Sequence, residues 1–457
     1  MEKINLIIEY TPSNEDMQAA SQNIDPAFSF NRQRSIQNFP ELGMATFDED
    51  FGLVPIPSPN LDAKISFAFS SDAPELKFEN VIARAQIEEE DLEAFVSQAE
   101  ESGVEVFSDP QIIPFAGNVS HPRGPLGTAR SVRSKLNIPA LGAKGFDGRD
   151  VAIAIVDSGI NLQHLQSQGV VAKLDPSLSW SPYPSSPPPG HWSVDHGTMC
   201  AYDALIAAPQ ATLLDFPILQ SKRSGGSVMS GYLSEAIAAF SVLLSEMSKP
   251  INRRAYNGIV VNNSWGMYNT GWDFPPGHSG RYADNSNHPF FRQVSSLSRA
   301  GADVLFAAGN CGISCPDGRC KNKQSSIIET NIITGANGHP DVLSIGGVDV
   351  NDDRLCYSSE GPSALGLDKP DLCAYTHFLG SRAYGHRAED SGTSAASPVM
   401  AGVIAALRSG FPAHNVTSSR MRDVARLSAN SFAPGSNWVA GFGHGIVDAV
   451  GMAQMLP

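Results

Sequence analysis

The segment Val151-Ala-Ile-Ala-Ile-Val-Asp-Ser-Gly-Ile160 decides the fold, because six apolar residues in a row end in a carboxylate and a glycine turn. An uninterrupted apolar run of this length predicts a strand that is buried on both faces, as in a parallel sheet covered by helices. Ligand sites in such sheets gather at the carboxyl ends of the strands. We therefore expect Asp157 at that edge of the sheet.

Other short apolar segments predict further strands of the same sheet. Between them lie helical patterns, such as the apolar residues that recur at helical spacing over 233–247. Strands that alternate with helices predict an α/β fold with a parallel sheet and helices on both faces. The further strands are expected at 212–216, 259–263, 304–308 and 342–345.

Two more polar side chains occupy comparable positions along the chain. His196, in Asp195-His-Gly-Thr-Met-Cys-Ala201, opens a helical run, and Asn310 ends the apolar strand Val304-Leu-Phe-Ala-Ala-Gly-Asn-Cys-Gly312. Because functional side chains collect at the carboxyl edge of such a sheet, we expect both to lie near Asp157.

Ser394 lies in Asp390-Ser-Gly-Thr-Ser-Ala-Ala-Ser-Pro-Val-Met-Ala-Gly402, where a glycine-rich turn becomes an apolar helix. A helix start leaves backbone N–H groups unpaired and carries partial positive charge, so a serine oxygen there lies beside donors for an oxyanion. Pro398 is expected in the first turn of this helix, where its missing N–H costs least. Taken alone, the segment is also typical of an ordinary helix cap.

These four side chains suit nucleophilic catalysis. A neutral hydroxyl is a weak nucleophile, so Ser394 needs a base, and the imidazole of His196 titrates near neutrality. Asp157 would accept the other ring N–H and stabilise the imidazolium. The Asn310 amide and the Ser394 backbone N–H would then bind the developing oxyanion.

The order of these four residues and their flanking segments resemble the subtilisin-like serine protease (subtilase) family, peptidase family S8. The resemblance covers about residue 136 to the C-terminus and includes Val260-Val-Asn-Asn-Ser-Trp-Gly266 and Lys369-Pro-Asp371. It implies a serine endopeptidase that cuts polypeptide substrates through an acyl-enzyme and needs no cofactor for its chemistry. Two other functions fit the same residues: a catalytically silent interaction module, and an esterase or amidase with the same triad.

By the same resemblance, two segments would wall the pocket for the residue before the scissile bond: Ser264, Trp265 and Gly266 on one side, and Ala307, Ala308 and Gly309 on the other. Gly226 to Met229 would pair with the substrate backbone as an added strand. Trp265 suggests an apolar contact with the substrate, and a core tryptophan is an equal alternative. No acidic residue is placed at the base of the pocket, so no specificity for basic residues is predicted. Structural calcium is common in the family, but no compact acidic loop locates a site, and no metal ligand is predicted.

The segment after His196 departs from the family pattern. Met199 stands where a second histidine is usual, and Tyr202 replaces a glycine. Neither is expected to carry a proton in the mechanism. Cys200 is interpreted as a small buried hydrophobic residue, with a thiol-sensitive activity as the alternative.

Three of the six cysteines crowd the loop after Asn310, at positions 311, 315 and 320. Free thiols are the favoured interpretation, because a cytosolic compartment keeps cysteines reduced. A disulfide, or a zinc ion with Cys356 or Cys373 as fourth ligand, are the alternatives.

The region before the protease-like part has its own pattern. Strand candidates at 4–10, around Ile65, Phe67 and Phe69, and from Val81 onward are interleaved with two helical segments. The order β-α-β-β-α-β predicts an α+β ferredoxin-like domain. It resembles the inhibitory propeptide of many subtilases, which makes it a possible intramolecular inhibitor; a generic interaction domain is the alternative. The predicted boundaries are 1–116 for this domain, 117–135 for an exposed linker and 136–457 for the catalytic domain.

Composition excludes some partners. The chain has 457 residues, 42% of them apolar, and a net charge of −15, which argues against nucleic acid or an anionic membrane surface. Its first ten residues are too short and too interrupted by charge for a signal peptide, and no run approaches 18 apolar residues. A cytoplasmic location is therefore expected, with a secreted one as the alternative.

Overall fold

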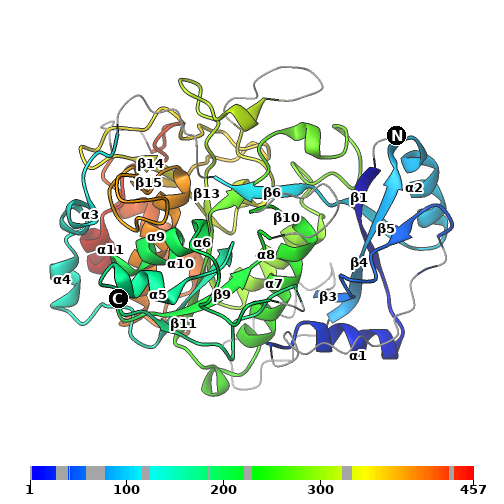
Figure 1. Cartoon of the computed structure of the whole chain (residues 1–457), viewed down its shortest axis with the longest axis horizontal. Helices are drawn as coiled ribbons and strands as arrows, with labels where there is room; N and C mark the ends of the chain where they lie inside the picture. The colour runs from blue at the N-terminus through cyan, green and yellow to red at the C-terminus, as the bar shows by residue number, and fades with distance from the viewer. Residues whose placement is uncertain are drawn as a thin grey trace.

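A seven-stranded sheet lies at the centre of the larger part of the molecule (Figure 1). The computed structural model describes residues 3–26, 40, 42–57, 78–115, 124–183, 186–220, 229–321, 332–431 and 437–457. Across the sheet the strands follow the order β15 (Leu372–Tyr375), β14 (Leu343–Val348), β13 (Asp303–Ala307), β11 (Gly258–Asn263), β7 (Val151–Asp157), β9 (Thr212–Pro217) and β8 (Lys173–Leu174). All neighbouring strands are parallel. The five predicted strands are present, and the short edge strands β8 and β15 are additional.

Helices cover both faces of this sheet. α6 (His196–Leu205) and α9 (Thr393–Arg408) pack on one face, and α7 (Leu233–Met247) and α8 (Pro289–Arg299) cover the other. Every residue of β7 is buried, and its side chains alternate between the two apolar clusters that these helices form. The predicted α/β fold is therefore confirmed, for the physical reason that a strand buried on both faces must be apolar throughout.

The remaining helices surround this core. They are α3 (Ala129–Lys135), α4 (Ile138–Gly142), α5 (Leu162–Ser167), α10 (Ser418–Ser428) and α11 (Ala449–Met455), with the short 3-10 turns η5 (Ile251–Arg253), η6 (Thr270–Trp272), η7 (Gly318–Cys320) and η8 (Gly335–Gly338). The prediction of an exposed linker at 117–135 is wrong over α3. Thr128 caps that helix through a reciprocal bond with Ser131, and Val132 is buried in the core.

The N-terminal part forms a separate antiparallel sheet, at the right of Figure 1. Its elements are β1 (Lys3–Tyr10), α1 (Asn14–Asn23), β2 (Thr46–Phe47), β3 (Val54–Pro57), β4 (Phe78–Glu88), η4 (Glu89–Asp91), α2 (Leu92–Glu101) and β5 (Glu105–Ser108). β1 lies between β4 and β5, and β2 and β3 both pair with β4. This is the strand arrangement of a ferredoxin-like sandwich, as predicted. The strand predicted around Ile65 lies outside the described residues.

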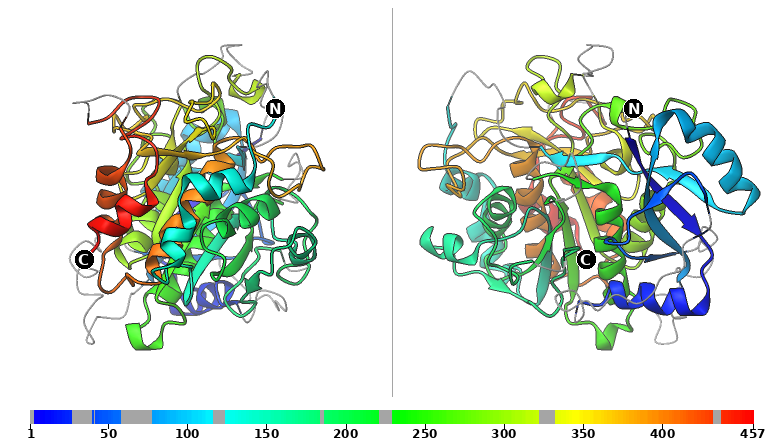
Figure 2. Two further views of the ribbon diagram at one scale, coloured as in Figure 1. Left: turned by 90° about the vertical axis from the view of Figure 1, so that its left-hand side faces the viewer. Right: turned by 45° about the vertical axis from the view of Figure 1, so that its right-hand side comes forward.

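This N-terminal sheet packs against the larger part through contacts of β3 with α7 and α8, and the right-hand view of Figure 2 shows the N-terminal part beside the larger part. Side chains of the sheet, among them Ile56 and Ile82, belong to the same apolar cluster as α7 and α8. At the centre of the contact, the buried Arg84 faces Asp109 and Glu235 at 3.4 and 3.2 Å. Both carboxylates lie at the start of α7, where negative charge is favoured.

After β5 the chain leaves its own sheet and enters another. β6 (Gln111–Pro114) lies between β10 (Gly231–Tyr232) and β12 (Trp265–Gly266) and is antiparallel to both. The described segment that follows β5 is thus held as the middle strand of a small sheet on the larger part.

Candidate active site

Asp157 and His196 meet at the carboxyl edge of the central sheet, as predicted. Asp157 is the last residue of β7, and His196 is the first residue of α6, whose N-cap Asp195 accepts the His196 backbone N–H. The imidazole Nδ1 lies 2.8 and 2.9 Å from the two carboxylate oxygens of Asp157. A carboxylate partner holds the proton on Nδ1, so Nε2 keeps its lone pair for a second proton. Nε2 is buried and has no hydrogen-bond partner.

Ser394 is the second residue of α9, and its hydroxyl donates to the backbone carbonyl of Ser264 at 3.0 Å. The nucleophile predicted from the sequence is therefore at the expected place, in an orientation that directs its proton toward Ser264 rather than the imidazole. Catalytic hydrogen bonds often tighten only when substrate is bound productively.

Pro398 lies inside α9 and not in its first turn, so that prediction is wrong by one turn. Because proline has no N–H, the carbonyl of Ser394, four residues earlier, lacks its usual intrahelical donor. The Ser264 hydroxyl donates to this carbonyl instead, at 2.9 Å. Pro398 thus frees the Ser394 carbonyl for a bond to Ser264, which directly follows β11.

Asn310 follows β13 at the same edge of the sheet, and Thr393 fixes its orientation. The amide oxygen of Asn310 accepts from the backbone N–H and the hydroxyl of Thr393, at 2.9 and 3.1 Å. The amide nitrogen consequently faces the cleft, where it donates to the carbonyl of Phe115 at 2.6 Å. Gly392 has φ 78°, and a Cβ there would collide with the same carbonyl oxygen, so the position requires glycine.

β6 runs through the cleft that these residues border. Pro114 pairs with Trp265 and Ile113 with Gly266, and the Phe115 backbone N–H donates to the Ser264 carbonyl at 3.0 Å. On its other side β6 pairs with β10; residues 226–228 of the segment predicted to pair with substrate, 226–229, lie outside the described residues.

Members of both predicted pocket walls border the Phe115 ring, Gly266 on one side and Ala307 and Gly309 on the other. Ala308, the middle residue of the second wall, donates its backbone N–H to a carbonyl of β14. The side chain of Trp265 points away from the cleft, donates to the Val156 carbonyl at 2.8 Å and packs in the core, so the alternative of a core tryptophan is the one observed.

Sequence reasoning missed Asn337, which joins the two walls. Its amide nitrogen donates to the carbonyls of Trp265 and Ala307, each at 2.9 Å. It lies in the short turn η8 and no motif surrounds it, so only the folded chain reveals it.

Four cysteines form disulfides, Cys311 with Cys320 and Cys315 with Cys356. The favoured interpretation of free thiols in this loop is therefore wrong, and so is the zinc alternative, because disulfide sulfurs are no longer thiolate ligands. The interpretation failed because it took the compartment from the N-terminus, whereas pairing depends on distances that the fold sets.

Cys200 is free and buried directly beside the paired side chains, 3.7 Å from an Asp157 carboxylate oxygen. Burial, and secondarily the charge of Asp157, raises the pKa of its thiol well above the usual value, so it is a neutral residue at neutral pH, as interpreted. In the described part of the chain, Asp157, His196 and Cys200 are the sole group of three potential metal ligands close together. Contacts among the three side chains explain why they lie close together. A structural calcium site stays a prediction.

Two buried carboxyl groups, those of Asp203 and Asp390, lie close together near the site. Asp390, four residues before Ser394, accepts from the backbone N–H and the hydroxyl of Ser381. Burial raises its pKa to about 6. Burial and the nearby Asp390 raise the pKa of Asp203, on α6, well above its usual value. No sequence motif indicates this pair, because only the packing of α6 against the segment before α9 brings the two carboxyl groups together.

Comparison with known proteins yields consistent matches. A family model described as the subtilase family matches residues 148–445. Subtilisin DY of Bacillus licheniformis is 27% identical over 321 residues, which are 68% of this chain and 94% of that protein. Furin of Rattus norvegicus is 26% identical over 70% of this chain and 39% of its own length, and endoprotease bli of Onchocerca volvulus is 24% identical over 76% and 48%. The match thus spans less than half of these two animal proteins. No helix in the described ranges has the length and apolar character needed to cross a bilayer.

Proposed function

Because this chain belongs to the subtilase family, we propose that it is a serine endopeptidase in which Ser394 is the nucleophile, His196 the general base and Asp157 the partner of the imidazole. The observation that carries the proposal is the position of β6. A segment of the chain itself lies in the cleft as an added strand, with the Phe115 carbonyl on the Asn310 amide.

The chemistry follows from the site. His196 Nε2 takes the hydroxyl proton of Ser394 as the oxygen attacks the peptide carbonyl carbon. The Asn310 amide and the Ser394 backbone N–H stabilise the negative charge that develops on the carbonyl oxygen. His196 then gives its proton to the leaving amine, the C–N bond breaks and an acyl-enzyme forms, which water hydrolyses by the same steps. No cofactor takes part in this sequence.

We further propose that the N-terminal domain is an intramolecular inhibitor and that the enzyme cuts its own chain after Phe115. Asn310 and Ser264 contact the Phe115 carbonyl and N–H as they would contact a substrate residue before a scissile bond. While β6 stays in place, other polypeptides are excluded from the cleft. The peptide bond from Phe115 to Ala116 lies just before the linker predicted at 117–135, at the end of the predicted N-terminal domain.

The two disulfides also bear on location. Disulfides form and persist in oxidising compartments and are rare in the cytosol. The bonds of Cys311 and Cys315 therefore support the secreted alternative over the cytoplasmic location expected from the sequence.

The test is Ser394→Ala in the full chain. We expect this variant to remain one uncut polypeptide and to hydrolyse no protein substrate, whereas the parent chain is cut and becomes active. A fluorophosphonate probe should label the processed parent and not the variant. A parent chain that takes no label would indicate a silent interaction module, and a labelled chain that leaves unfolded protein intact would indicate an esterase or amidase.

A further inference from the structure

We propose that the loop Cys311–Cys320, closed by its disulfide, together with Tyr268, selects substrates with an aromatic residue before the scissile bond and clamps the next carbonyl upstream. This inference rests on the proposed function, because it assumes that β6 lies in the cleft in the same way as a bound substrate strand.

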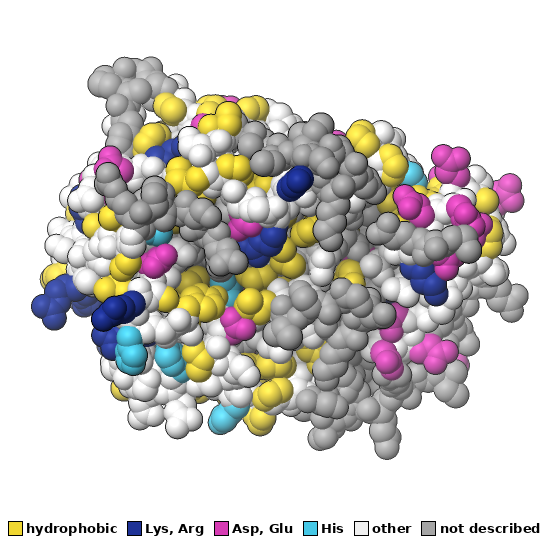
Figure 3. Space-filling view, turned by 45° about the horizontal axis from the view of Figure 1, so that its top comes forward, with side chains coloured by type: hydrophobic (Ala, Val, Ile, Leu, Met, Phe, Trp, Pro, Cys, Tyr) yellow, Lys and Arg dark blue, Asp and Glu magenta, His cyan; other side chains and the backbone are white. Residues whose placement is uncertain are grey.

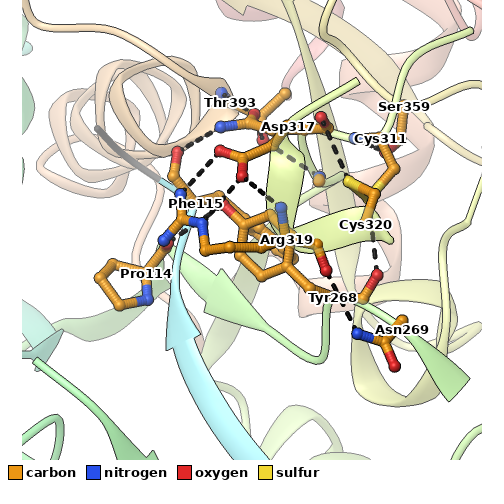
Figure 4. Close-up of a disulfide and its surroundings, with 12 residues drawn as sticks. Pro114, Phe115, Tyr268, Asn269, Cys311, Asp317, Arg319, Cys320, Ser359 and Thr393 are labelled. Atoms are coloured by element: carbon orange, nitrogen blue, oxygen red, sulfur yellow. Dashed lines mark hydrogen bonds and ion pairs between the residues drawn. A yellow bond between two sulfur atoms is a disulfide. The ribbon is translucent and has the colours of Figure 1, made fainter. Parts of the chain in front are cut away.

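The pocket around Phe115 is apolar and fitted to a ring. The Phe115 side chain is only 3% exposed and meets the Tyr268 ring edge-on, with centroids 5.0 Å apart and planes at 62° (Figure 4). Ala307, Cys311 and Cys320 complete the same buried cluster. The disulfide that begins directly after Asn310 packs behind Tyr268, whose backbone carbonyl oxygen lies 3.6 Å from the Cys311 sulfur. Edge-to-face contact of this kind adds about 0.5–1.5 kcal/mol beyond burial of area.

Gly266 keeps the pocket open for the ring. A Cβ at Gly266 would lie 2.5 Å from the outermost carbon of the Phe115 ring, whereas one at Gly309 would lie 3.6 Å from it, an ordinary van der Waals contact. A side chain at Gly266 would therefore fill the space that the ring occupies. The slot suits a planar group that enters between two backbone segments.

In the described loop from Cys311 to Cys320 the charged side chains are already paired, so a basic residue of the substrate finds no free counter-ion there. Asp317 accepts two bonds from the Arg319 side chain, at 2.9 and 2.8 Å. A lysine or arginine of the substrate would lose its hydration in an apolar pocket without gaining a carboxylate partner. An acidic residue would meet the same cost.

The same loop reaches the substrate backbone one residue upstream. The Pro114 carbonyl accepts from the Tyr268 hydroxyl at 3.2 Å and from the Arg319 guanidinium at 3.3 Å. The guanidinium carbon also lies 4.3 Å from the centre of the Tyr268 ring, so the two donors support each other. Burial raises the pKa of Tyr268 well above its usual value, which keeps the phenol protonated as a donor.

The disulfide joins these features. Cys311 follows Asn310 and Cys320 follows Arg319, so one bond ties the oxyanion donor to the clamp. The Asp317 backbone N–H also donates to the Asn310 carbonyl at 2.9 Å, which folds the loop back on the same residue. Loss of the disulfide should therefore loosen both the pocket wall and the contacts to the Pro114 carbonyl.

The experiment uses the enzyme that forms when the full-length chain has cut itself. It measures kcat/KM on peptides that differ only in the residue before the scissile bond: Phe, Tyr, Leu, Lys or Asp. We expect Phe and Tyr to exceed Leu by about tenfold and Lys or Asp by about a hundredfold or more, the range that an apolar pocket provides. Cut sites in an unfolded protein, mapped by mass spectrometry, should follow aromatic residues, and the chain's own cut should follow Phe115.

Variants assign the preference to its residues. Gly266→Val should remove the preference for aromatic residues, whereas Gly142→Ala, at a glycine with open space around it, should not. Tyr268→Phe keeps the ring and should raise KM about tenfold with the ratio of Phe to Leu retained. Cys311→Ser with Cys320→Ser should lower that ratio, and Cys315→Ser with Cys356→Ser should leave it.

Failure of this inference differs from failure of the proposed function. An active, probe-labelled enzyme that cuts equally well after Leu, Lys and Phe would overturn the selectivity and leave the protease assignment intact. A chain that neither takes the probe nor cuts after Phe115 would overturn both. If the double cysteine variants do not fold, Gly266→Val and Tyr268→Phe still decide the matter, because both keep the disulfides.

Discussion

At the scale of single residues, the Asn310 amide has one orientation available to it. Both donors of Thr393 contact its oxygen, so its nitrogen must face the carbonyl in the cleft. We expect Asn310→Leu to lower kcat by about 10²–10³, because the amide is needed only once the oxyanion forms. Steady-state kinetics of the processed enzyme measure this, and circular dichroism checks that the variant folds. A change confined to KM would make Asn310 a substrate-binding residue instead.

The identity of the site residues could be predicted from the sequence, but their orientations could not. Asp157 and His196 stand at a strand end and a helix start, and these positions are visible in the hydrophobic pattern. The direction of the Ser394 hydroxyl, the core position of Trp265 and the pairing of Cys315 with Cys356 depend on groups far away in the chain. Local pattern carries no information about such contacts.

At the scale of elements, the contact between α6 and the approach to α9 contains the buried Asp390. Its pKa of about 6 in the folded protein is above its ordinary value of 3.8, so folding tightens proton binding. This group therefore stabilises the fold in full below about pH 4, and that contribution is lost as the pH rises to about 6. The loss is at most about 1.4 kcal/mol per pH unit.

The substitution Asp390→Asn removes this titration while it keeps the shape of the protonated acid. In the Ser394→Ala chain, the Tm of the variant relative to its parent should rise between pH 4 and pH 6 and then stay level. Calorimetry across pH 4–8 measures this, with Asp423→Asn at an exposed aspartate as the control. A Tm difference that stays constant over the whole range would show that Asp390 is ionised throughout.

Strands with a continuous apolar run were predictable, and the short strands at the cleft were not. β7 and β11 are buried on both faces, and the apolar runs 151–156 and 259–261 mark them. β6, β10 and β12 have two to four residues each and exist because they pair with one another across the cleft. Their sequences contain a proline or a glycine, which weakens any prediction made without the partner strand.

At the scale of the whole molecule, Arg84 holds the two parts together. It is 4% exposed, and its guanidinium donates to the Ser234 hydroxyl at 2.8 Å and faces Asp109 and Glu235. Removal of one partner from a buried charge cluster typically costs 3–5 kcal/mol, because the remaining charges lose their compensation. Arg84→Met should therefore lower the Tm of the Ser394→Ala chain by several degrees and weaken inhibition of the active enzyme.

Arg149→Met is the matched control for this prediction. Arg149 is largely exposed and pairs with Asp147 at 3.3 Å, a contact that contributes at most about 1 kcal/mol. Differential scanning calorimetry and the activity of freshly cut enzyme compare the two variants. If they behave alike, Arg84 has no special part in docking.

The net charge of the chain belongs almost entirely to one of its parts. Residues 1–116 contain 22 acidic and six basic residues, whereas residues 117–457 contain 25 and 26. In the face shown in Figure 3, acidic side chains are correspondingly frequent at the right, where the N-terminal sheet lies. The acidity that argued against nucleic acid as a partner is therefore a property of the proposed inhibitor, and the protease part is close to neutral.

β6 places the proposed inhibitor and its target in one polypeptide, so before the cut the cleft is occupied at an effective concentration that the chain itself fixes, commonly millimolar for a short connection. Dilution cannot change this value, and the cut after Phe115 should follow first-order kinetics whatever the amount of protein. After the cut the same contacts hold two separate molecules, and their dissociation depends on concentration. Time courses at a series of protein concentrations should therefore show a constant rate of cutting, with activity that appears sooner in the more dilute samples. A cutting rate that grows with concentration would instead mean that one molecule processes another.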